Sequence, residues 1–215
     1  MFKKKTALFV GAHFDDIEIG CSGTILNLIK KKYKIVFLIV TDSVIINYQN
    51  KIIRSKKNIL KESLKAFKIL NVKKHICLNL KTNDIRFDDN SKRHFISVVE
   101  KYQPSIMFTH HPFDLHFDHQ IVGKISLNFS RKIPNVYLYR SNFYKNIKNF
   151  NKNCYVDISK EFEKKIMAIS CYKSELKRVG NSWKKYIESE NRENGIEINS
   201  KYAEAFEIFR SLKIW

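Results

Sequence analysis

The sequence lacks any long apolar run. Its longest, residues 35–40 (IVFLIV), has the length of a buried strand and falls far short of the roughly 20 residues that a membrane-spanning helix requires. The N-terminal segment MFKKKTALFVGAHFDD begins like a signal peptide, but its apolar stretch is short and leads directly into polar residues. We therefore expect no transmembrane segment, and we expect a soluble protein of the cytoplasm.

Cysteine is also scarce, and the four cysteines form no CxxC pair. They are widely spaced, at Cys21, Cys77, Cys154 and Cys171. Four scattered cysteines in a chain of 215 residues do not make a disulfide framework. The pattern is typical of reduced and mostly buried thiols.

Acidic residues are few, because 21 of them stand against 40 lysines and arginines, which leaves a net charge of +19. This charge indicates either an anionic partner, such as a phosphate-bearing substrate, a nucleic acid or a membrane surface, or a compositional habit. The lysines are spread along the chain without the aromatic interleaving of a nucleic-acid surface. The sequence therefore favours a generally lysine-rich composition as the explanation of this charge, and a phosphorylated small substrate as the second explanation. It predicts no nucleic-acid partner.

Segments of strand and helix character alternate along the chain. Expected strands are residues 6–12, 34–41, 75–80, 105–109, 136–139 and 154–158, and expected helices are residues 20–31, 52–70, 91–102, 119–129 and 159–177. This order predicts an α/β, Rossmann-like fold with a mostly parallel sheet flanked by helices on both faces. Residues 142–153 and 178–200 are expected to be irregular, and residues 202–212 to form a closing helix or strand. We interpret residues 1–215 as a single domain.

Two clusters of histidine and carboxylate residues follow two of the expected strands. The first contains His13, Asp15 and Asp16, and the second contains Asp114, His116, Asp118 and His119. Parallel α/β sheets place ligands outside the carboxyl ends of their strands, so the fold would bring both clusters to one rim. Either cluster alone is explained as well by helix capping. Together they predict a functional site.

The composition of these clusters favours metal-assisted hydrolysis. Three histidine and carboxylate ligands suit a catalytic Zn²⁺ that keeps one position open for water. A bound metal lowers the pKa of that water to about 7 and polarises a carbonyl. A neighbouring carboxylate that is not a ligand can then take the proton.

The residues resemble a known family, the PIG-L/LmbE-like N-deacetylases, which are zinc-dependent amino-sugar de-N-acetylases. AHFDDIEIG (residues 12–20) is similar to the family signature AHPDDxEIG, and DLHFDH (residues 114–119) matches its DxHxDH. Weaker similarity continues through residues 62–72, 155–159 and 202–210, and so spans nearly the whole chain.

The resemblance implies a role for each matching residue. The expected ligands of Zn²⁺, or of another divalent metal, are His13, Asp16 and His119. Asp15 would be the general base that activates water, and His116 would stabilise the oxyanion or protonate the leaving amine. Asp118 would orient His116.

The substrate positions depart from the family pattern. Val44 and Ile59 stand where the family often has an acidic residue and an arginine. Expected substrate contacts are Glu18, Asp84 and Arg54, with Arg54 or Lys57 replacing the missing arginine. The two family prolines are Phe14 and Phe117 here, and neither position is a ligand.

The sequence thus predicts a hydrolase of a linear amide C–N bond that removes an N-acetyl group from an N-acetylated sugar. A nucleotide-linked, lipid-linked or phosphorylated sugar would fit the positive charge. Two alternatives remain: an amidase of the same fold that acts on another amide, and a sugar- or metal-binding module without turnover. The sequence is compatible with an oligomer but contains no segment that indicates one.

Overall fold

A computed structural model describes residues 5–142, 149–180 and 182–212. The described chain builds a seven-stranded sheet in the order β5-β2-β1-β6-β7-β9-β8. Its strands are β1 (Thr6–Gly11), β2 (Lys34–Thr41), β5 (His75–Leu80), β6 (Ile106–His110), β7 (Asn135–Tyr139), β8 (Cys154–Asp157) and β9 (Ala203–Arg210). The first five strands of this order are mutually parallel, and β9 runs antiparallel to both of its neighbours. The predicted mostly parallel α/β sheet is confirmed.

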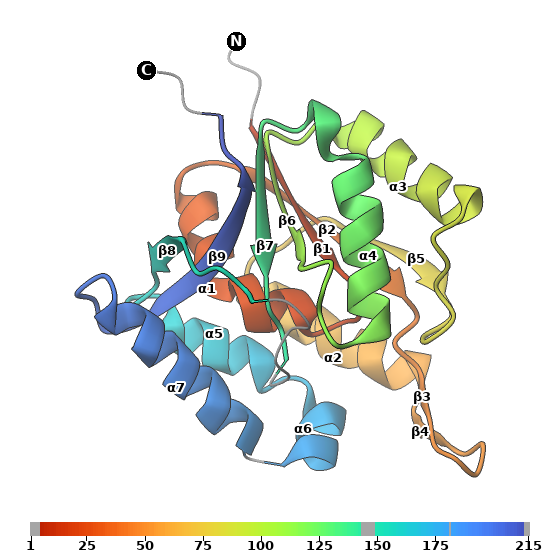
Figure 1. The fold of residues 1–215 in the computed structure, drawn as a ribbon. Coiled ribbons are helices and arrows are strands. Elements are labelled where there is room, and N and C mark those ends of the chain that lie inside the picture. Colours follow the sequence, from red (N-terminus) through yellow and green to blue (C-terminus); the bar gives the residue numbers. More distant parts are fainter. Residues whose placement is uncertain (1–4, 143–148, 181, 213–215) are drawn as a thin grey trace.

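Helices cover both faces of this sheet (Figure 1). The helices are α1 (Asp16–Lys30), α2 (Lys56–Ile69), α3 (Asp89–Tyr102), α4 (Phe117–Asn128), α5 (Phe162–Ile169), α6 (Lys173–Val179) and α7 (Ser182–Ile196), with a short 3₁₀ turn at Ser130–Lys132. Helices α3 and α4 share one buried cluster with the sheet, and α1, α2, α5 and α7 share the other. No helix of the described ranges is long and apolar enough to cross a membrane.

The central strands are apolar throughout because both of their faces are buried. In β1, Ala7 and Phe9 pack into one core cluster, whereas Leu8 and Val10 pack into the other. This division follows from the two-residue period of a strand, which sends successive side chains to opposite faces. A continuous apolar run of strand length is the expected signature of such a sheet.

Several predicted elements differ from the observed ones. Residues 52–54 belong to β4 (Ile52–Arg54), which pairs with β3 (Ile45–Ile46), and α2 begins only after Ser55, whose side chain caps it. The helix predicted for residues 159–177 is two helices, α5 and α6, and Ser159 bonds to Asp157 instead of capping a helix.

The last third of the chain is more regular than expected. Most of the segment predicted to be irregular, residues 178–200, is the helix α7, whose buried apolar side chains are only Trp183 and Ile187. Residues 202–212 contain a strand, β9, as one of the two predicted forms. Of the irregular segment predicted at residues 142–153, positions 143–148 lie outside the described residues.

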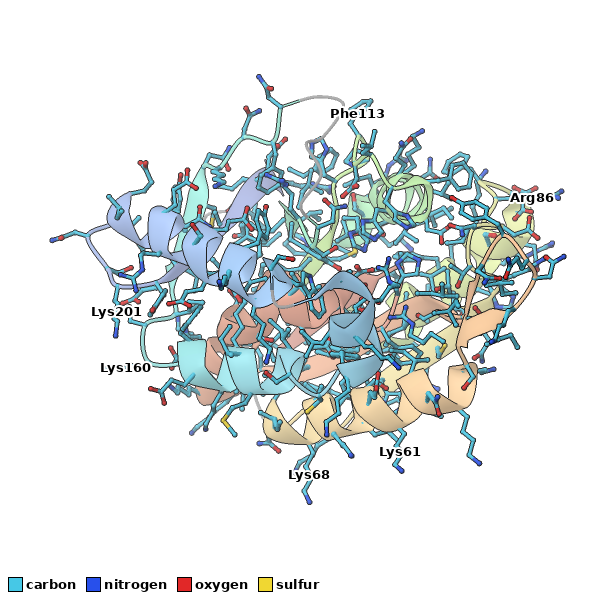
Figure 2. All side chains as sticks on the ribbon, turned by 90° about the horizontal axis from the view of Figure 1, so that it is seen from below. Lys61, Lys68, Arg86, Phe113, Lys160 and Lys201 are labelled. Carbon is cyan, nitrogen blue, oxygen red and sulfur yellow. The ribbon has the colours of Figure 1, made fainter. Side chains whose placement is uncertain are left out.

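Basic side chains are distributed over the whole molecule. Lys61 and Lys68 project from α2, and Arg86, Lys160 and Lys201 project from other parts of the surface (Figure 2). This distribution agrees with the dispersed lysines of the sequence.

The order of the strands creates a switch point between β1 and β6. From β1 the chain moves to β2 and β5 on one side, and it then returns to β6 and β7 on the other. Ligands of open α/β sheets bind at such a point, outside the carboxyl ends of the strands. Both predicted clusters directly follow these two strands.

Candidate metal centre and active site

Two loops at the switch point bring the three expected metal ligands together. His13 lies in the loop after β1, Asp16 begins α1, and His119 lies in the first turn of α4. The Nδ1 atom of His13 lies 3.4 Å from Asp16 Oδ2 and 3.3 Å from His119 Nε2, and that Nε2 lies 3.2 Å from Asp16 Oδ1. Two imidazole nitrogens and both oxygens of one carboxylate therefore face one another, and His119 is brought to the other two residues from a distant part of the sequence.

These separations fit a tetrahedral metal ion. Zn–N and Zn–O bonds of 2.0–2.1 Å at tetrahedral angles place neighbouring ligand atoms about 3.3 Å apart. Two overlapping groups in the described part of the chain have donors close enough for one ion: His13, His116 and His119, and Asp16, His110 and His119. Both contain His119, and the expected ligands His13 and Asp16 belong to one group each.

Each of the two histidines that are expected ligands is backed by a carboxylate. Nε2 of His13 lies 2.9 Å from Asp118 Oδ2, and Nδ1 of His119 lies 3.2 Å from Asp114 Oδ2. Such partners fix the ring and its tautomer, so that the opposite nitrogen is left as a ligand. In both rings the opposite nitrogen is the one that faces the centre.

Asp118 holds a different ring from the one that the sequence analysis assigned to it. Its carboxylate accepts hydrogen bonds from His13 and from the backbone N–H of Asn83, not from His116. His116 instead turns back to cap α4, where its Nδ1 accepts a hydrogen bond from the backbone N–H of Asp118 at 3.2 Å. The predicted orientation of His116 by the Asp118 side chain is therefore wrong, because that ring is held by the helix terminus.

The carboxylates make the centre strongly attractive to a cation. Burial lowers the pKa of His13, but hydrogen bonds to Asp118 and Asp16 raise it to about 9. Burial likewise lowers the pKa of His119, whereas Asp16 and Asp114 raise it to about 10. For His116, burial and the charges of the other two rings act in one direction and lower the pKa to about 4.

Asp15 stands beside these ligands in a strained backbone conformation. Its φ of 103° is unfavourable for a residue with a Cβ, and strain of this kind gathers at functional sites. Burial raises the pKa of Asp15 well above its ordinary value, and the nearby Arg54 guanidinium opposes this rise. Nη1 of Arg54 lies 3.4 Å from Asp15 Oδ2 and 2.9 Å from Glu175 Oε2.

A pocket of about 310 Å³ opens onto this centre. The residues predicted from the sequence that line it are His13, Asp15, Asp16, Arg54, His116 and His119. The two other predicted substrate contacts, Glu18 and Asp84, do not line this pocket. Glu18 is buried beneath the site, where it accepts a hydrogen bond from Tyr172, and Asp84 is half-exposed beside Arg86. The neighbours of Asp84, Thr82 and Asn83, line the pocket instead.

The sequence analysis missed several lining residues. Ser141 and Asn142 lie one residue beyond the end of β7, and Ser141 Oγ donates a hydrogen bond to Asp16 Oδ1 at 2.9 Å. The strand-end rule that identified the other clusters applies equally to β7 and could have found them. Glu175 and Arg178 reach the pocket from α6, whose polar pattern carries no comparable signal.

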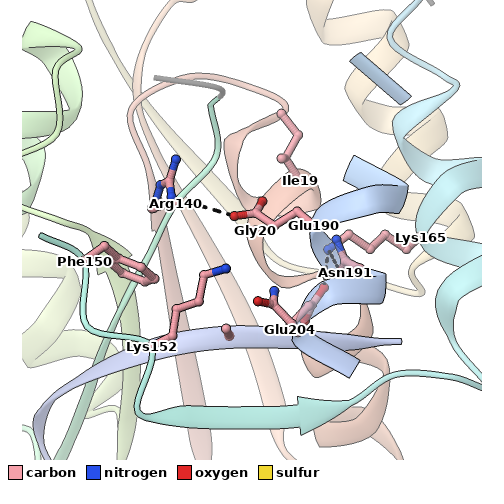
Figure 3. Close-up of a pocket in the computed structure, with 11 residues that line it drawn as sticks. Ile19, Gly20, Arg140, Phe150, Lys152, Lys165, Glu190, Asn191 and Glu204 are labelled. Carbon is pink, nitrogen blue, oxygen red and sulfur yellow. Dashed lines mark hydrogen bonds and ion pairs between the residues drawn. The ribbon is translucent and has the colours of Figure 1, made fainter. Parts of the chain in front are cut away.

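A smaller polar pocket lies on the other side of Ile19 and is occupied by its own ion pairs (Figure 3). The buried Lys165 donates to Glu204 Oε1 at 2.7 Å and to Asn191 Oδ1 at 3.1 Å, while Arg140 pairs with Glu190. Glu204 also accepts the backbone N–H groups of two residues in α1. These interactions tie α1, α5, α7 and β9 together.

Fold and site together define an α/β protein with a candidate metal centre at the switch point of its sheet. The chain belongs to the family described as GlcNAc-PI de-N-acetylase (PIG-L), whose sequence model matches residues 8–130. Membership identifies it as an N-deacetylase, which is a hydrolase.

Individual relatives agree with this family. An uncharacterized deacetylase of Escherichia coli K12, YaiS, is 30% identical over 154 residues, covering 65% of this chain and 75% of that protein. The diacetylchitobiose deacetylase of Thermococcus kodakarensis is 24% identical over 220 residues, covering 93% and 81%. The N,N'-diacetylchitobiose deacetylase structure from Pyrococcus horikoshii shares the fold, with a TM-score of 0.81 at 21% identity over 95% of this chain and 84% of that one.

Proposed function

We propose that this chain removes the acetyl group from the nitrogen of an N-acetylated sugar, with a divalent metal ion held by His13, Asp16 and His119. The observation that carries the proposal is that His13 Nδ1 and His119 Nε2 lie 3.3 Å apart, with one oxygen of Asp16 3.4 Å from the first nitrogen and the other oxygen 3.2 Å from the second. The carboxylates behind both histidines support the same ligand set. Zn²⁺ suits two imidazoles and one carboxylate.

The remaining residues supply proton transfer and charge stabilisation. A divalent ion in this site would polarise the amide carbonyl and make a coordinated water more acidic. Asp15, adjacent to the proposed ligand Asp16 in the pocket wall, accepts the proton of the attacking water and passes it to the amine nitrogen as the C–N bond breaks, which releases acetate and the free amine. Because His116 Nδ1 accepts a backbone hydrogen bond, its ring proton lies on Nε2. That Nε2–H is a donor for the oxyanion that forms on the carbonyl oxygen.

The net charge of +19 supports a sugar conjugate that carries negative charge. Arg54 and Arg178 both line the pocket, where each pairs with Glu175, and the Arg178 side chain is 48% exposed. Trp183 and Asn142 add an aromatic side chain and an amide to the same wall. The two relatives that act on diacetylchitobiose favour an N-acetyl sugar over another amide. A nucleotide-linked, lipid-linked or phosphorylated N-acetyl sugar combines both features.

We also propose that the protein works in the cytoplasm. All four cysteines are free thiols. This supports a reducing compartment, in which such thiols persist.

The test is amine release from a panel of free, nucleotide-linked and lipid-linked N-acetyl sugars, measured before and after treatment with a chelator. We expect release that the chelator abolishes and that added Zn²⁺ restores. Activity that persists after complete metal removal would overturn the metal assignment. Amine release from simple amides, but from no N-acetyl sugar, would show that the enzyme is an amidase and not a sugar deacetylase.

A further inference from the structure

The β3–β4 hairpin is a separate two-stranded sheet that extends away from the body of the protein (Figure 1). Ile46 and Ile52 are paired across its strands, so their side chains lie on the same face. They are 50% and 58% exposed, Ile53 is 51% exposed, and Tyr48 is fully exposed. Four large apolar side chains are thus presented to solvent within a few residues. Large exposed apolar side chains gathered in one segment indicate a site of interaction.

The charge around the hairpin has one sign. Between residues 43 and 61 the sequence contains no aspartate or glutamate. Four lysines in this segment are exposed: Lys51, Lys56, Lys57 and Lys61. Its fifth cation, Arg54, faces the pocket and is buried. The hairpin and the first turns of α2 therefore combine exposed apolar side chains with exclusively positive charge.

Exposed apolar side chains together with positive charge favour an anionic bilayer over a second copy of this chain as the partner of the hairpin. A second copy of the chain would bring the same lysines and another charge of +19 against it, and like charges oppose association. An anionic bilayer attracts each lysine and accepts isoleucine and tyrosine side chains at its interface. Of the two, only the bilayer complements both properties of the segment.

The same hairpin forms part of the catalytic pocket. Val44, Ile45 and Ile46 line the pocket at one end of the hairpin, while Tyr48, Ile52 and Ile53 do not. We propose that the hairpin docks on the surface of anionic phospholipid membranes, with Tyr48, Ile52 and Ile53 inserted among the lipids and the lysines beside the headgroups. Docking in this way brings the pocket to the membrane surface, where lipid-linked molecules lie. The docking surface goes beyond the proposed deacetylation and does not depend on it.

Vesicle sedimentation of the full chain tests this surface. We expect it to sediment with vesicles of phosphatidylcholine and phosphatidylserine, and not with phosphatidylcholine alone. The variant Tyr48→Ser/Ile52→Ser/Ile53→Ser should lower the partition coefficient about tenfold or more. The variant Lys51→Gln/Lys56→Gln/Lys57→Gln should lower it by about fivefold per lysine.

Two matched triple variants serve as controls. Met167→Ser/Ile196→Ser/Phe209→Ser removes exposed apolar side chains elsewhere, and Lys68→Gln/Lys160→Gln/Lys201→Gln removes exposed lysines elsewhere. Both should sediment like the unmodified chain, and circular dichroism should show that every variant is folded.

Three results would overturn the docking proposal. The unmodified chain could fail to bind the anionic vesicles, or the hairpin variants could bind as well as their controls. Alternatively, sedimentation equilibrium could show self-association that the Tyr48→Ser/Ile52→Ser/Ile53→Ser variant abolishes, which would make the hairpin an interface between copies. The vesicles contain no amino sugar, so failure of docking is distinguishable from failure of the proposed deacetylation.

Discussion

Two adjacent aspartates occupy different positions relative to the candidate metal centre. Asp16 carries both of the oxygens that face His13 and His119, whereas Asp15 contacts Arg54. We predict that Asp15→Asn keeps its metal affinity and loses about 10²–10⁴ in kcat, because only the proton acceptor is removed. Isothermal titration with Zn²⁺ and amine-release kinetics measure the two quantities separately.

The matched control for this prediction is Asp84→Asn. Asp84 is half-exposed outside the pocket, so its replacement should leave kcat and KM unchanged. Full activity of Asp15→Asn would refute the assignment of the base. A raised KM in Asp84→Asn would instead restore that residue as a substrate contact.

The contact of Asp118 with His13 leads to a second prediction, made with a pair of variants. Asp118→Asn should weaken metal binding by about 10–100-fold, because it loosens the ring of a ligand. His116→Gln should keep metal affinity and lower kcat by about 10²–10³, the usual effect of removing one oxyanion donor. A chelator competition assay compares both variants with the unmodified chain. Strong loss of metal from His116→Gln would show that His116 is itself a ligand.

The residues that gather at the candidate metal centre were predictable from the sequence, but the hydrogen bonds between their side chains were not. The rule that ligands bind at strand ends places His13, Asp16 and His119 on one rim before any coordinates are known. Which ring the Asp118 carboxylate holds depends on the turn at the start of α4. Because that turn occupies His116 Nδ1 as a cap, the carboxylate is left to reach His13.

Among the secondary-structure elements, α1 is held in place by a buried charge on β9. Glu204 accepts the N–H groups of Gly23 and Thr24 and pairs with Lys165, and both charged side chains are almost fully buried. We predict that Lys165→Met lowers the free energy of unfolding by about 3–5 kcal/mol, because it leaves an unpaired buried carboxylate. Urea denaturation measures this change.

The exposed neighbour on the same helix provides the control for this ion pair. Lys164→Met should change the free energy of unfolding by less than about 0.5 kcal/mol. Equal midpoints for Lys165→Met and Lys164→Met would show that the buried pair contributes nothing to stability.

The elements themselves were predictable where the apolar period is strong and missed where it is weak. The central strands are apolar on both faces, and this pattern indicates strands before the structure is known. Helix α7 buries only Trp183 and Ile187 among its large apolar side chains, too few to create a visible stripe. The helix predicted from residue 52 begins later because Ile52 and Ile53 are exposed on a hairpin instead of packed in the core.

Considered as a whole, the molecule joins two distant parts of its sequence at the metal centre. The expected ligands come from the β1–α1 and β6–α4 connections, so a bound ion would tie both halves of the sheet together. We predict that Zn²⁺ at about a hundred times its Kd raises the free energy of unfolding by about 2.7 kcal/mol. Chemical denaturation with and without the ion measures this gain. His119→Ala should abolish it, and an undiminished gain in that variant would place the ion elsewhere.

The parallel core of the sheet was predictable because its strands and helices alternate along the chain. The placement of β9 was not. It pairs with β7 and β8 in antiparallel register and separates two strands that precede it in the sequence. The alternation of apolar residues does not reveal such an insertion, because pairing between distant strands depends on the whole assembled sheet.

The place of β9 has a consequence for synthesis on the ribosome. All three expected metal ligands, and β8, emerge before β9, which is the neighbour of β8 in the sheet and carries the Glu204 that anchors α1. A nascent chain therefore holds every ligand for some time while α1, which carries Asp16, still lacks this anchor. A premature stop codon shortly before residue 203 would leave a product in this condition: complete in its metal-binding residues, open along one sheet edge, and exposed to cellular proteases.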